Sequence, residues 1–452
     1  MNRPPDIFFD HSDPDETSAS LTPSVAPSVF ADAPEPMVRS GVFSIFDQGI
    51  VSGTNFLTTL LIARACSQDE LGVYSLAWMI VLFLAAVQGN LVCVPYTMYC
   101  HHRSADSLAE YTGSTMAHQL IISMGAMLCF LGLSLWLSLG VGPEGLRSAA
   151  WVLLGVIPFI LLRDYARRFS FAHLALGTAV AVDIGVAVLQ LGSLLVLWWF
   201  GWLSAATGYG VMGAACAVAC LGWWLLKKPS IRFSRRGFTR DWRQNWSFGR
   251  WALTGQITGL AFYCLPWLLA LARSEAETGE LAACTSLVGL SNLFVTGLNN
   301  FLMPKAAQAF FQRGVRALGS VLRKALLWSM VVLGSLCLFV YFFGSFLAQT
   351  LYGPAYADTG LLINVLALAT LTDSLGLMAS TGLWAMDHPA ANFGGDLVQM
   401  LVTLAVAFWF VFPFGAVGVA TALVIGRASG AAVRWFILVG VMAREHRKSV
   451  TV

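Results

Sequence analysis

Apolar runs long enough to cross a membrane constrain this chain more than any other feature of its sequence. A membrane-spanning helix needs about 20 consecutive, mostly apolar residues, and twelve such runs can be placed along the 452 residues. The sequence therefore predicts an all-α polytopic membrane protein with about twelve transmembrane helices. The runs cover residues 42–63, 72–98, 115–139, 149–162, 179–200, 205–226, 251–272, 281–303, 325–348, 360–385, 393–412 and 415–441.

Composition agrees with this fold class and argues against an enzyme. Hydrophobic residues make up 57% of the chain and charged residues 11%, whereas soluble domains contain roughly 45–50% apolar and about 25% charged residues. The sequence also lacks the H-E-x-x-H zinc motif, the G-x-x-x-x-G-K-[ST] phosphate loop and the G-x-S-x-G nucleophile elbow. We therefore expect no enzymatic activity, no cofactor and no metal site.

The distribution of basic residues predicts the orientation in the membrane. With twelve spans both termini lie on one side, and 22 of the 27 Lys and Arg residues fall in the tails and loops of that side. Basic residues resist translocation across a membrane. We therefore expect both termini in the cytoplasm, and a multi-pass protein of the cell inner (plasma) membrane.

The same patterns divide the chain into five segments. Residues 1–38 hold seven prolines and seven acids against one arginine, which predicts a disordered acidic tail. Basic residues and aromatics alternate in the linker, and this mixture beside a span favours anionic lipid headgroups over nucleic acid as the partner. After the tail come an N-terminal six-helix bundle (39–226), a basic cytoplasmic linker (227–250), a C-terminal six-helix bundle (251–441) and a basic cytoplasmic tail (442–452).

An internal repeat relates the two bundles. Asn90 and Pro95 form the pattern N-x-x-x-x-P at the end of the second run, and Asn299 and Pro304 repeat it at the end of the eighth, 209 residues later. An even number of spans per repeat gives the halves parallel orientations. In transporters built this way the substrate binds between the repeats, which rock to alternate access. Further matches at offsets of 206 to 213 are Gly49 with Gly255, Glu70 with Glu280, Asp164 with Asp373, and Asp183 with Asp396.

Ionisable residues inside the apolar runs are candidates for ion coupling, because charges at membrane depth are costly and usually functional. Asp373 lies well inside the tenth run and Asp47 near the start of the first. We predict that these two carboxylates couple transport to H⁺ or Na⁺, although Asp47 could equally lie at a hydrated helix end. Arg427 and Arg434 share a helix face and could meet a phosphate, pair with an acid or reach toward the interface.

Two stretches of the sequence resemble a known family. Ser44–Phe56, Ile62–Arg64 and Gln68–Ala77 resemble the opening of polysaccharide flippases, whose first loop reads A-R-x-L-G-x-x-E-[FY]-G-x-[YF]-x-L-A. Leu351–Tyr356 resembles their recurring [LF]-[FY]-G-x-x-Y motif. These flippases are a branch of the multidrug/oligosaccharidyl-lipid/polysaccharide (MOP) exporter superfamily. The resemblance extends over residues 40–441.

The resemblance implies a fold and a function. The expected fold has two six-helix bundles around a central cavity lined largely by spans one, two, seven and eight. The expected function is to flip a polyprenyl-diphosphate-linked oligosaccharide outward across the membrane for polysaccharide or lipopolysaccharide biosynthesis, together with other assembly proteins. We expect Arg64 or Arg250 to contact the phosphate. The predicted cavity residues are Asn55, Asn90, Asn299, Asn300, Gln256, Arg64 and Arg250.

One departure from this picture keeps an alternative open. The cations of the expected cavity spans, Arg64, Arg250, Arg273 and the flanking Lys305, lie only at span ends, and the deep charges are acids. A diphosphate substrate favours a cationic cavity, whereas an acidic one suits a cation-coupled multidrug and toxin extrusion antiporter. A membrane scaffold without transport activity is a third possibility.

Overall fold

The computed structural model describes residues 35–140 and 142–450. The predicted tail 1–38 therefore lies almost wholly outside the described residues and stays a prediction. The chain divides into a segment up to Val42 and a compact unit from Phe43 to Val452. All contacts discussed below lie within this second unit.

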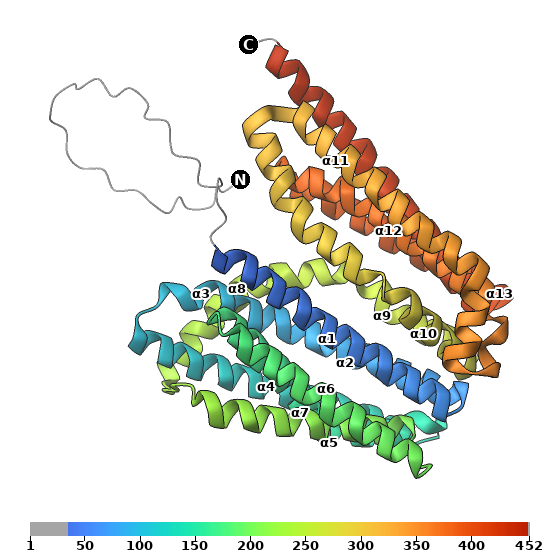
Figure 1. Ribbon diagram of the computed structural model, residues 1–452. Coiled ribbons are helices and arrows are strands. Elements are labelled where there is room, and N and C mark those ends of the chain that lie inside the picture. Colours follow the sequence, from blue (N-terminus) through green and yellow to red (C-terminus); the bar gives the residue numbers. More distant parts are fainter. Residues whose placement is uncertain (1–34, 141, 451–452) are drawn as a thin grey trace. The chain divides into compact units, whose positions relative to one another are not determined.

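The described residues form helices and contain no β-strand, which confirms the all-α fold class. Figure 1 shows the helices of the first half in blue to green and those of the second half in yellow to red. The elements are α1 (Glu35–Ala65), α2 (Gln68–Gln88), η1 (Gly89–Cys93), α3 (Val94–Tyr99), η2 (Cys100–His102), α4 (Ala105–Leu137), α5 (Glu144–Ala172), α6 (Leu176–Trp199), α7 (Ala205–Lys227), α8 (Arg235–Thr258), α9 (Leu260–Ala272), α10 (Glu275–Gly289), α11 (Asn292–Tyr352), η3 (Pro354–Thr359), α12 (Gly360–Ala385) and α13 (Pro389–Val450).

Two very long helices are each broken by a glycine. α11 has 61 residues and α13 has 62, and at 1.5 Å per residue each would be about 90 Å long if straight, three times the hydrocarbon thickness. Gly314 (φ 71°) and Gly415 (φ 53°) interrupt them with a left-handed backbone that glycine adopts without steric penalty. Each helix therefore supplies two spans; the break at Gly314 falls between two predicted runs, and the break at Gly415 falls at the first residue of the last one.

Three further spans are assembled from shorter pieces. α2, the π-helical turn η1 and α3 together match the predicted run 72–98. α8 and α9 are joined by a bend of 44°, and α10 continues into the first part of α11 after a short break. Among the described residues, eight helices are long and apolar enough to span a membrane, or nine when α8 and α9 count as one. With α11 and α13 divided and α1 and α10 included, the helices account for the twelve predicted spans.

The predicted linker 227–250 has a regular structure. It is helical from Arg235 onward and forms the first part of α8, which packs against α4 and η1 of the first half. α9 instead packs against α10 and α13 of the second half, as well as against α2. The chain thus passes from one half to the other at the α8–α9 bend.

The two halves meet where α2 and α10 begin. A Cβ atom added at Gly72 would lie 1.9 Å from the carbonyl oxygen of Glu275, and one at Gly279 would lie 2.1 Å from that of Gln68. The Gln68 amide also donates to Glu280 at 3.2 Å. We call these five residues the α2–α10 clasp. Gly72 and Gly279 occupy equivalent places in it, 207 residues apart.

Helix capping repeats at the same offset. Glu70 Oε2 accepts a hydrogen bond from the Ala205 N–H at the start of α7 (2.7 Å), and Glu277 Oε2 accepts one from the Ala416 N–H after the break in α13 (3.1 Å). A carboxylate at a helix N-terminus satisfies a free N–H and interacts favourably with the helix dipole. Glu70 therefore corresponds to Glu277, three residues from the predicted partner Glu280.

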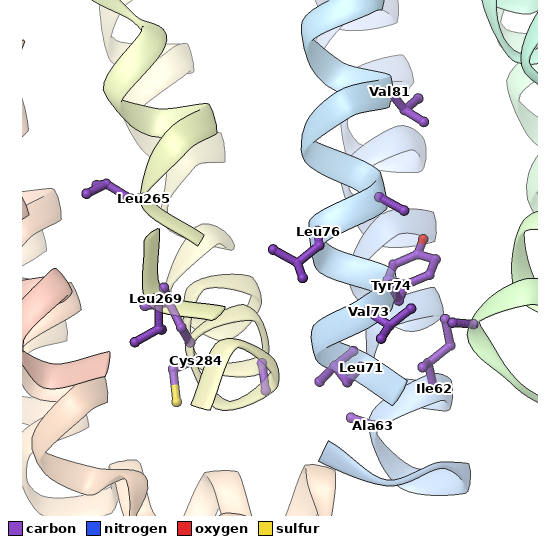
Figure 2. Packing of buried hydrophobic residues seen from close by; sticks show 14 of the residues in the cluster. Ile62, Ala63, Leu71, Val73, Tyr74, Leu76, Val81, Leu265, Leu269 and Cys284 are labelled. Carbon is purple, nitrogen blue, oxygen red and sulfur yellow. The ribbon is translucent and has the colours of Figure 1, made fainter. Parts of the chain in front are cut away.

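A continuous apolar cluster joins the halves beside the clasp. Figure 2 shows side chains of α1 and α2 on one side and side chains of α9 and α10 on the other. Inside a bilayer, side chains of this kind hold helices together through close van der Waals packing rather than through removal from water. The labelled members are Ile62, Ala63, Leu71, Val73, Tyr74, Leu76, Val81, Leu265, Leu269 and Cys284.

Candidate substrate cavity

A cavity of about 370 Å³ lies between the two halves. Its walls come from α1, α2, α9 and α10, which are the four spans that the family resemblance implies, and also from α12 and the second part of α13. The clasp lies at the beginning of α2 and α10, and the cavity extends along the same two helices from there. The lining residues are Ser52, Asn55, Phe56, Thr59, Leu71, Tyr74, Ser75, Trp78, Met79, Leu82, Phe262, Leu265, Pro266, Leu281, Ala282, Thr285, Ser286, Val288, Gly289, Leu290, Asn292, Leu366, Thr370, Val419, Leu423 and Arg427.

The cavity wall is mostly apolar, with a limited set of hydrogen-bonding groups. Aromatic rings come from α1, α2 and α9, and amides and hydroxyls come from several helices. No carboxylate belongs to the described lining, and Arg427 is its one charged residue. The one charged group of the described wall is therefore a cation, set in an otherwise apolar and neutral polar surface.

Arg427 also lines the cavity, and helix periodicity alone leaves a phosphate, an acid and the interface all open as its partner. Its Nε lies 3.6 Å from Oδ1 of Asp373 on α12, and the side chains are 22% and 47% exposed. At this distance and exposure the pair is loose, and exposed ion pairs contribute little to stability. The expected cavity spans were those with cations only at their ends, but the described wall also includes the last span, which adds Arg427.

Of the seven predicted cavity residues, Asn55 lines the cavity. The other six lie elsewhere. Arg64 donates to the carbonyl oxygens of Thr350 (2.6 Å) and Leu351 (3.0 Å), so it joins α1 to the end of α11. Asn90 lies in the η1 turn and donates to the carbonyl of Ala86 at 2.9 Å.

The remaining four predicted residues do not form part of the described cavity wall. Gln256, Asn299 and Asn300 lie on α8 and the first part of α11. Arg250 is exposed on α8, with its guanidinium 5.6 Å from the ring centre of Trp251. The arrangement thus gathers one predicted residue, Asn55, at the cavity and distributes the others over both halves.

Asp47 belongs to a buried charge network in the first half. Its carboxylate forms an ion pair with Arg167, whose Nε also lies 2.9 Å from Asp183 Oδ2. Arg163 forms a further ion pair with Asp183. The two carboxylates have no exposed side-chain surface. The network joins α1, α5 and α6, and its two negative charges face two positive ones. We call it the α1–α5–α6 charge network.

A buried arginine with a partly exposed acid forms a second ion pair in the other half. Arg434 pairs with Asp396, and its guanidinium also donates to Gln399 Oε1 at 3.3 Å. A Cβ atom at Gly395 would lie 2.5 Å from Arg434 Cγ, and one at Gly376 would lie 2.9 Å from its Nη1. The arginine therefore fills a slot bounded by two glycines, and the stem of its side chain packs directly against Gly395. Arg427 and Arg434, seven residues apart, have different surroundings.

Comparison with known proteins provides matches at the level of the fold. No family model matches the sequence, and no curated protein matches it. The fold is similar to the inward-facing conformation of a multidrug resistance MATE family transporter of the MOP superfamily, with a TM-score of 0.75 and 15% identity over 88% of this chain and 95% of that chain.

Other solved structures of the same superfamily also have a similar fold. The lipid II flippase MurJ in an inward closed conformation matches with a TM-score of 0.72 and 13% identity over 89% of this chain and 87% of that chain. A MOP superfamily transporter from Pyrococcus furiosus, for which a reversed polarity of the binding pocket suggests a different function, matches with a TM-score of 0.65 and 15% identity over 90% and 95%. This chain is thus a multi-pass membrane protein with the fold of MOP superfamily transporters.

Proposed function

We propose that the protein is a flippase that moves a polyprenyl-diphosphate-linked oligosaccharide outward across the inner membrane by alternating access. The observation that carries this proposal is Arg427, the one charged residue of the described cavity wall, in a lining without a carboxylate. A guanidinium can hold phosphate oxygens through two parallel hydrogen bonds. A cavity of this polarity favours an anionic headgroup.

The rest of the lining suits the other parts of such a substrate. Asn55, Asn292 and the neighbouring serine and threonine hydroxyls can exchange hydrogen bonds with sugar hydroxyls. Tyr74 and Trp78 offer flat apolar faces. A volume of about 370 Å³ is at the small end for ligand sites. The cavity can therefore hold the diphosphate and its nearest sugar while the polyprenyl chain stays in the lipid.

Asp373 is the carboxylate that we propose for ion coupling. When a phosphate binds Arg427, Asp373 loses the cation 3.6 Å away and becomes a site for H⁺ or Na⁺. Asp47, the other predicted coupling residue, already faces Arg167 in the α1–α5–α6 charge network. We therefore expect Asp373→Asn to abolish the dependence of transport on the ion gradient and to leave substrate binding in place.

The cation-coupled drug antiporter is the second candidate function. The side chain of Asp373 is 47% exposed beside the cavity, so an organic cation could approach it. The two functions differ in which of the paired residues is essential. A flippase for a diphosphate needs Arg427, whereas an antiporter for cations needs Asp373 and should tolerate a neutral residue at 427.

Gene deletion followed by complementation tests the proposal. In the deletion strain we expect lipid-linked oligosaccharide to accumulate in the membranes, wild type to reduce this pool, and Arg427→Lys to reduce it only in part, because lysine keeps the charge but lacks the bidentate fork. Arg427→Gln should fail by about tenfold or more, since a hydrogen bond to a charged group contributes roughly 1.5–3 kcal/mol. Arg313→Gln, a change at an exposed arginine of α11, is the control. Normal lipid pools with new sensitivity to organic cations would favour the antiporter instead.

A further inference from the structure

The first part of α8 has two chemically opposite faces. Gly237, Asp241, Asn245 and Gly249 are all buried and follow one another at intervals of four residues, so they lie on one side of the helix. The opposite side carries five arginines, exposed to solvent and without an intervening acid on that face. We call them the arginine stripe: Arg235, Arg236, Arg240, Arg243 and Arg250.

The buried face fixes α8 to the first half of the protein. Arg103 donates to Asp241 at 3.1 Å, and the Tyr111 hydroxyl donates to Asn245 at 2.9 Å. A Cβ atom at Gly249 would lie 2.8 Å from a carbonyl oxygen of the η1 turn, so the helices are in close backbone contact. The arginine stripe is therefore held outward on a helix with a fixed face.

The charges of the arginine stripe are poorly neutralised. Arg240 lies 3.2 Å from Asp241, whose same carboxylate oxygen also accepts from Arg103. Within the described residues, no ion pair joins Arg235, Arg236, Arg243 or Arg250 to an acid. An exposed row of guanidinium groups of this kind attracts a ligand with several negative charges.

The position of the arginine stripe along the chain connects it with the cavity. α8 and α9 run from residue 235 to 272, about 57 Å of helix at 1.5 Å per residue, which is nearly twice the hydrocarbon thickness of about 30 Å. α9 lines the cavity through Phe262, Leu265 and Pro266, so the first part of α8 extends beyond the apolar core. Trp246 and Trp251, 45% and 70% exposed, are residue types that favour the headgroup region.

We propose that the arginine stripe is a landing site for the diphosphate of the lipid-linked substrate, which binds there in the cytoplasmic leaflet before it enters the cavity. This inference rests on the proposed function and adds a second, outer binding site to it. A diphosphate carries more charge on adjacent groups than an ordinary phospholipid headgroup does. Neighbouring guanidinium groups at helical spacing can contact both phosphates, whereas bulk anionic lipid requires only positive charge.

The full-length protein in nanodiscs of neutral phosphatidylcholine allows a direct test, with farnesyl diphosphate as the probe. The key variant changes Arg236, Arg240 and Arg243 to Gln, because these three lie at intervals of four and three residues, and a second variant changes the same three residues to Lys. The matched control removes three exposed charges from α11 with Arg313→Gln, Arg323→Gln and Lys324→Gln. Binding affinity is measured at several salt concentrations, with and without competing phosphatidylglycerol.

We expect the Gln variant to bind farnesyl diphosphate at least about tenfold more weakly and with a smaller salt dependence, because phosphate contacts through arginine are charge-assisted. The Lys variant should lose most of the same affinity, since lysine lacks the bidentate fork. The control should bind as wild type does. Full binding in the Lys variant, or equal competition by phosphatidylglycerol, would assign the arginine stripe to bulk anionic lipid and overturn the proposal.

The proposal for the arginine stripe and the proposal for the cavity can be contradicted independently of each other. Arg427→Gln should leave farnesyl diphosphate binding at the arginine stripe largely intact while it blocks translocation of the lipid-linked oligosaccharide. If translocation is absent in wild type but binding still depends on the three arginines, the proposed function is wrong and the landing site for a prenyl diphosphate stands. Unchanged binding in the Gln variant removes the landing site and leaves the cavity proposal untouched.

Discussion

Acidic residues of two kinds occur inside the helices, and their surroundings give them different roles. Asp47 has no exposed side-chain surface and faces Arg167, whereas Asp373 is 47% exposed and only loosely paired with Arg427. A buried carboxylate with a close cation is fixed by the charge that it neutralises. A half-exposed carboxylate with a distant cation can exchange its partner during transport.

The first prediction concerns stability. Asp47→Ala leaves Arg167 with one fewer negative partner in a buried position, and breaking such a pair costs about 3–5 kcal/mol. We expect a marked fall in the thermal unfolding temperature of the purified protein in detergent. Asp373→Asn serves as the matched control, because loosely paired and exposed charges contribute at most about 1 kcal/mol. Equal stability of the two variants would contradict the structural role of the α1–α5–α6 charge network.

Sequence patterns could identify the charged residues but not their partners. The spacing of Arg427 and Arg434 placed both on one helix face, yet Arg434 fills a slot between Gly376 and Gly395 while Arg427 faces the cavity. Which of the two reaches the cavity depends on where α12 and the first part of α13 approach. That information comes from tertiary packing, since helix periodicity describes only one element.

At the scale of elements, the helix breaks were easier to predict than the helical structure of the basic segment 227–250. The polar interruption between runs 281–303 and 325–348 marked the break at Gly314, and the boundary between runs 393–412 and 415–441 marked the break at Gly415. The segment 227–250 resembled a linker because its charge dominates its composition. At helical spacing, however, it contains a stripe of small and polar residues: Gly237, Asp241, Asn245 and Gly249. That stripe could have been recognised as a docking face.

The second prediction tests the close approach of α2 and α10. A methyl group at Gly72 or Gly279 would overlap a backbone oxygen of the opposite helix, and neither backbone can move without separating the helices. Overpacking of this kind typically costs about 1–3 kcal/mol. We expect Gly72→Ala and Gly279→Ala to weaken the α2–α10 clasp and to increase the labelling of a cysteine placed at Gln68 by a water-soluble thiol reagent.

Glycines with free space around them provide the control for this experiment. A Cβ atom at Gly125 on α4 or Gly185 on α6 would meet no atom within 4 Å. Alanine there should leave the labelling at position 68 unchanged and stabilise the helix slightly, by roughly 0.5–1 kcal/mol. Labelling that rises equally in all four alanine variants would show that the effect is general loosening and would remove the argument for the clasp.

At the scale of the whole molecule, the two halves are connected at one end and by one helix. The clasp and the bond from Arg64 to the carbonyl of Thr350 hold the beginning of α2 and α10 together. α8 packs mainly on the first half, and α9 packs mainly on the second half but also on α2. A rocking motion would therefore have to open the clasp and change the 44° bend between α8 and α9.

The third prediction tests whether transport requires the α2–α10 clasp to open. Gln68 Nε2 and Glu280 Oε1 lie 3.2 Å apart, one from each half. We replace both residues with cysteine in a variant whose nine native cysteines are changed to alanine, and treat it with a short, cleavable thiol cross-linker. If transport requires the halves to separate at the clasp, cross-linking should stop the release of accumulated lipid-linked oligosaccharide, and cleavage of the linker should restore it.

Two comparisons make the result specific to the clasp. Each single cysteine variant treated with the same reagent should retain transport, because one modified thiol cannot join the halves. The cross-linked protein should still bind farnesyl diphosphate at the arginine stripe, since that face of α8 moves with the first half alone. Transport that continues in fully cross-linked protein would mean that the substrate crosses without separation of α2 and α10, and alternating access by rocking would then be wrong for this chain.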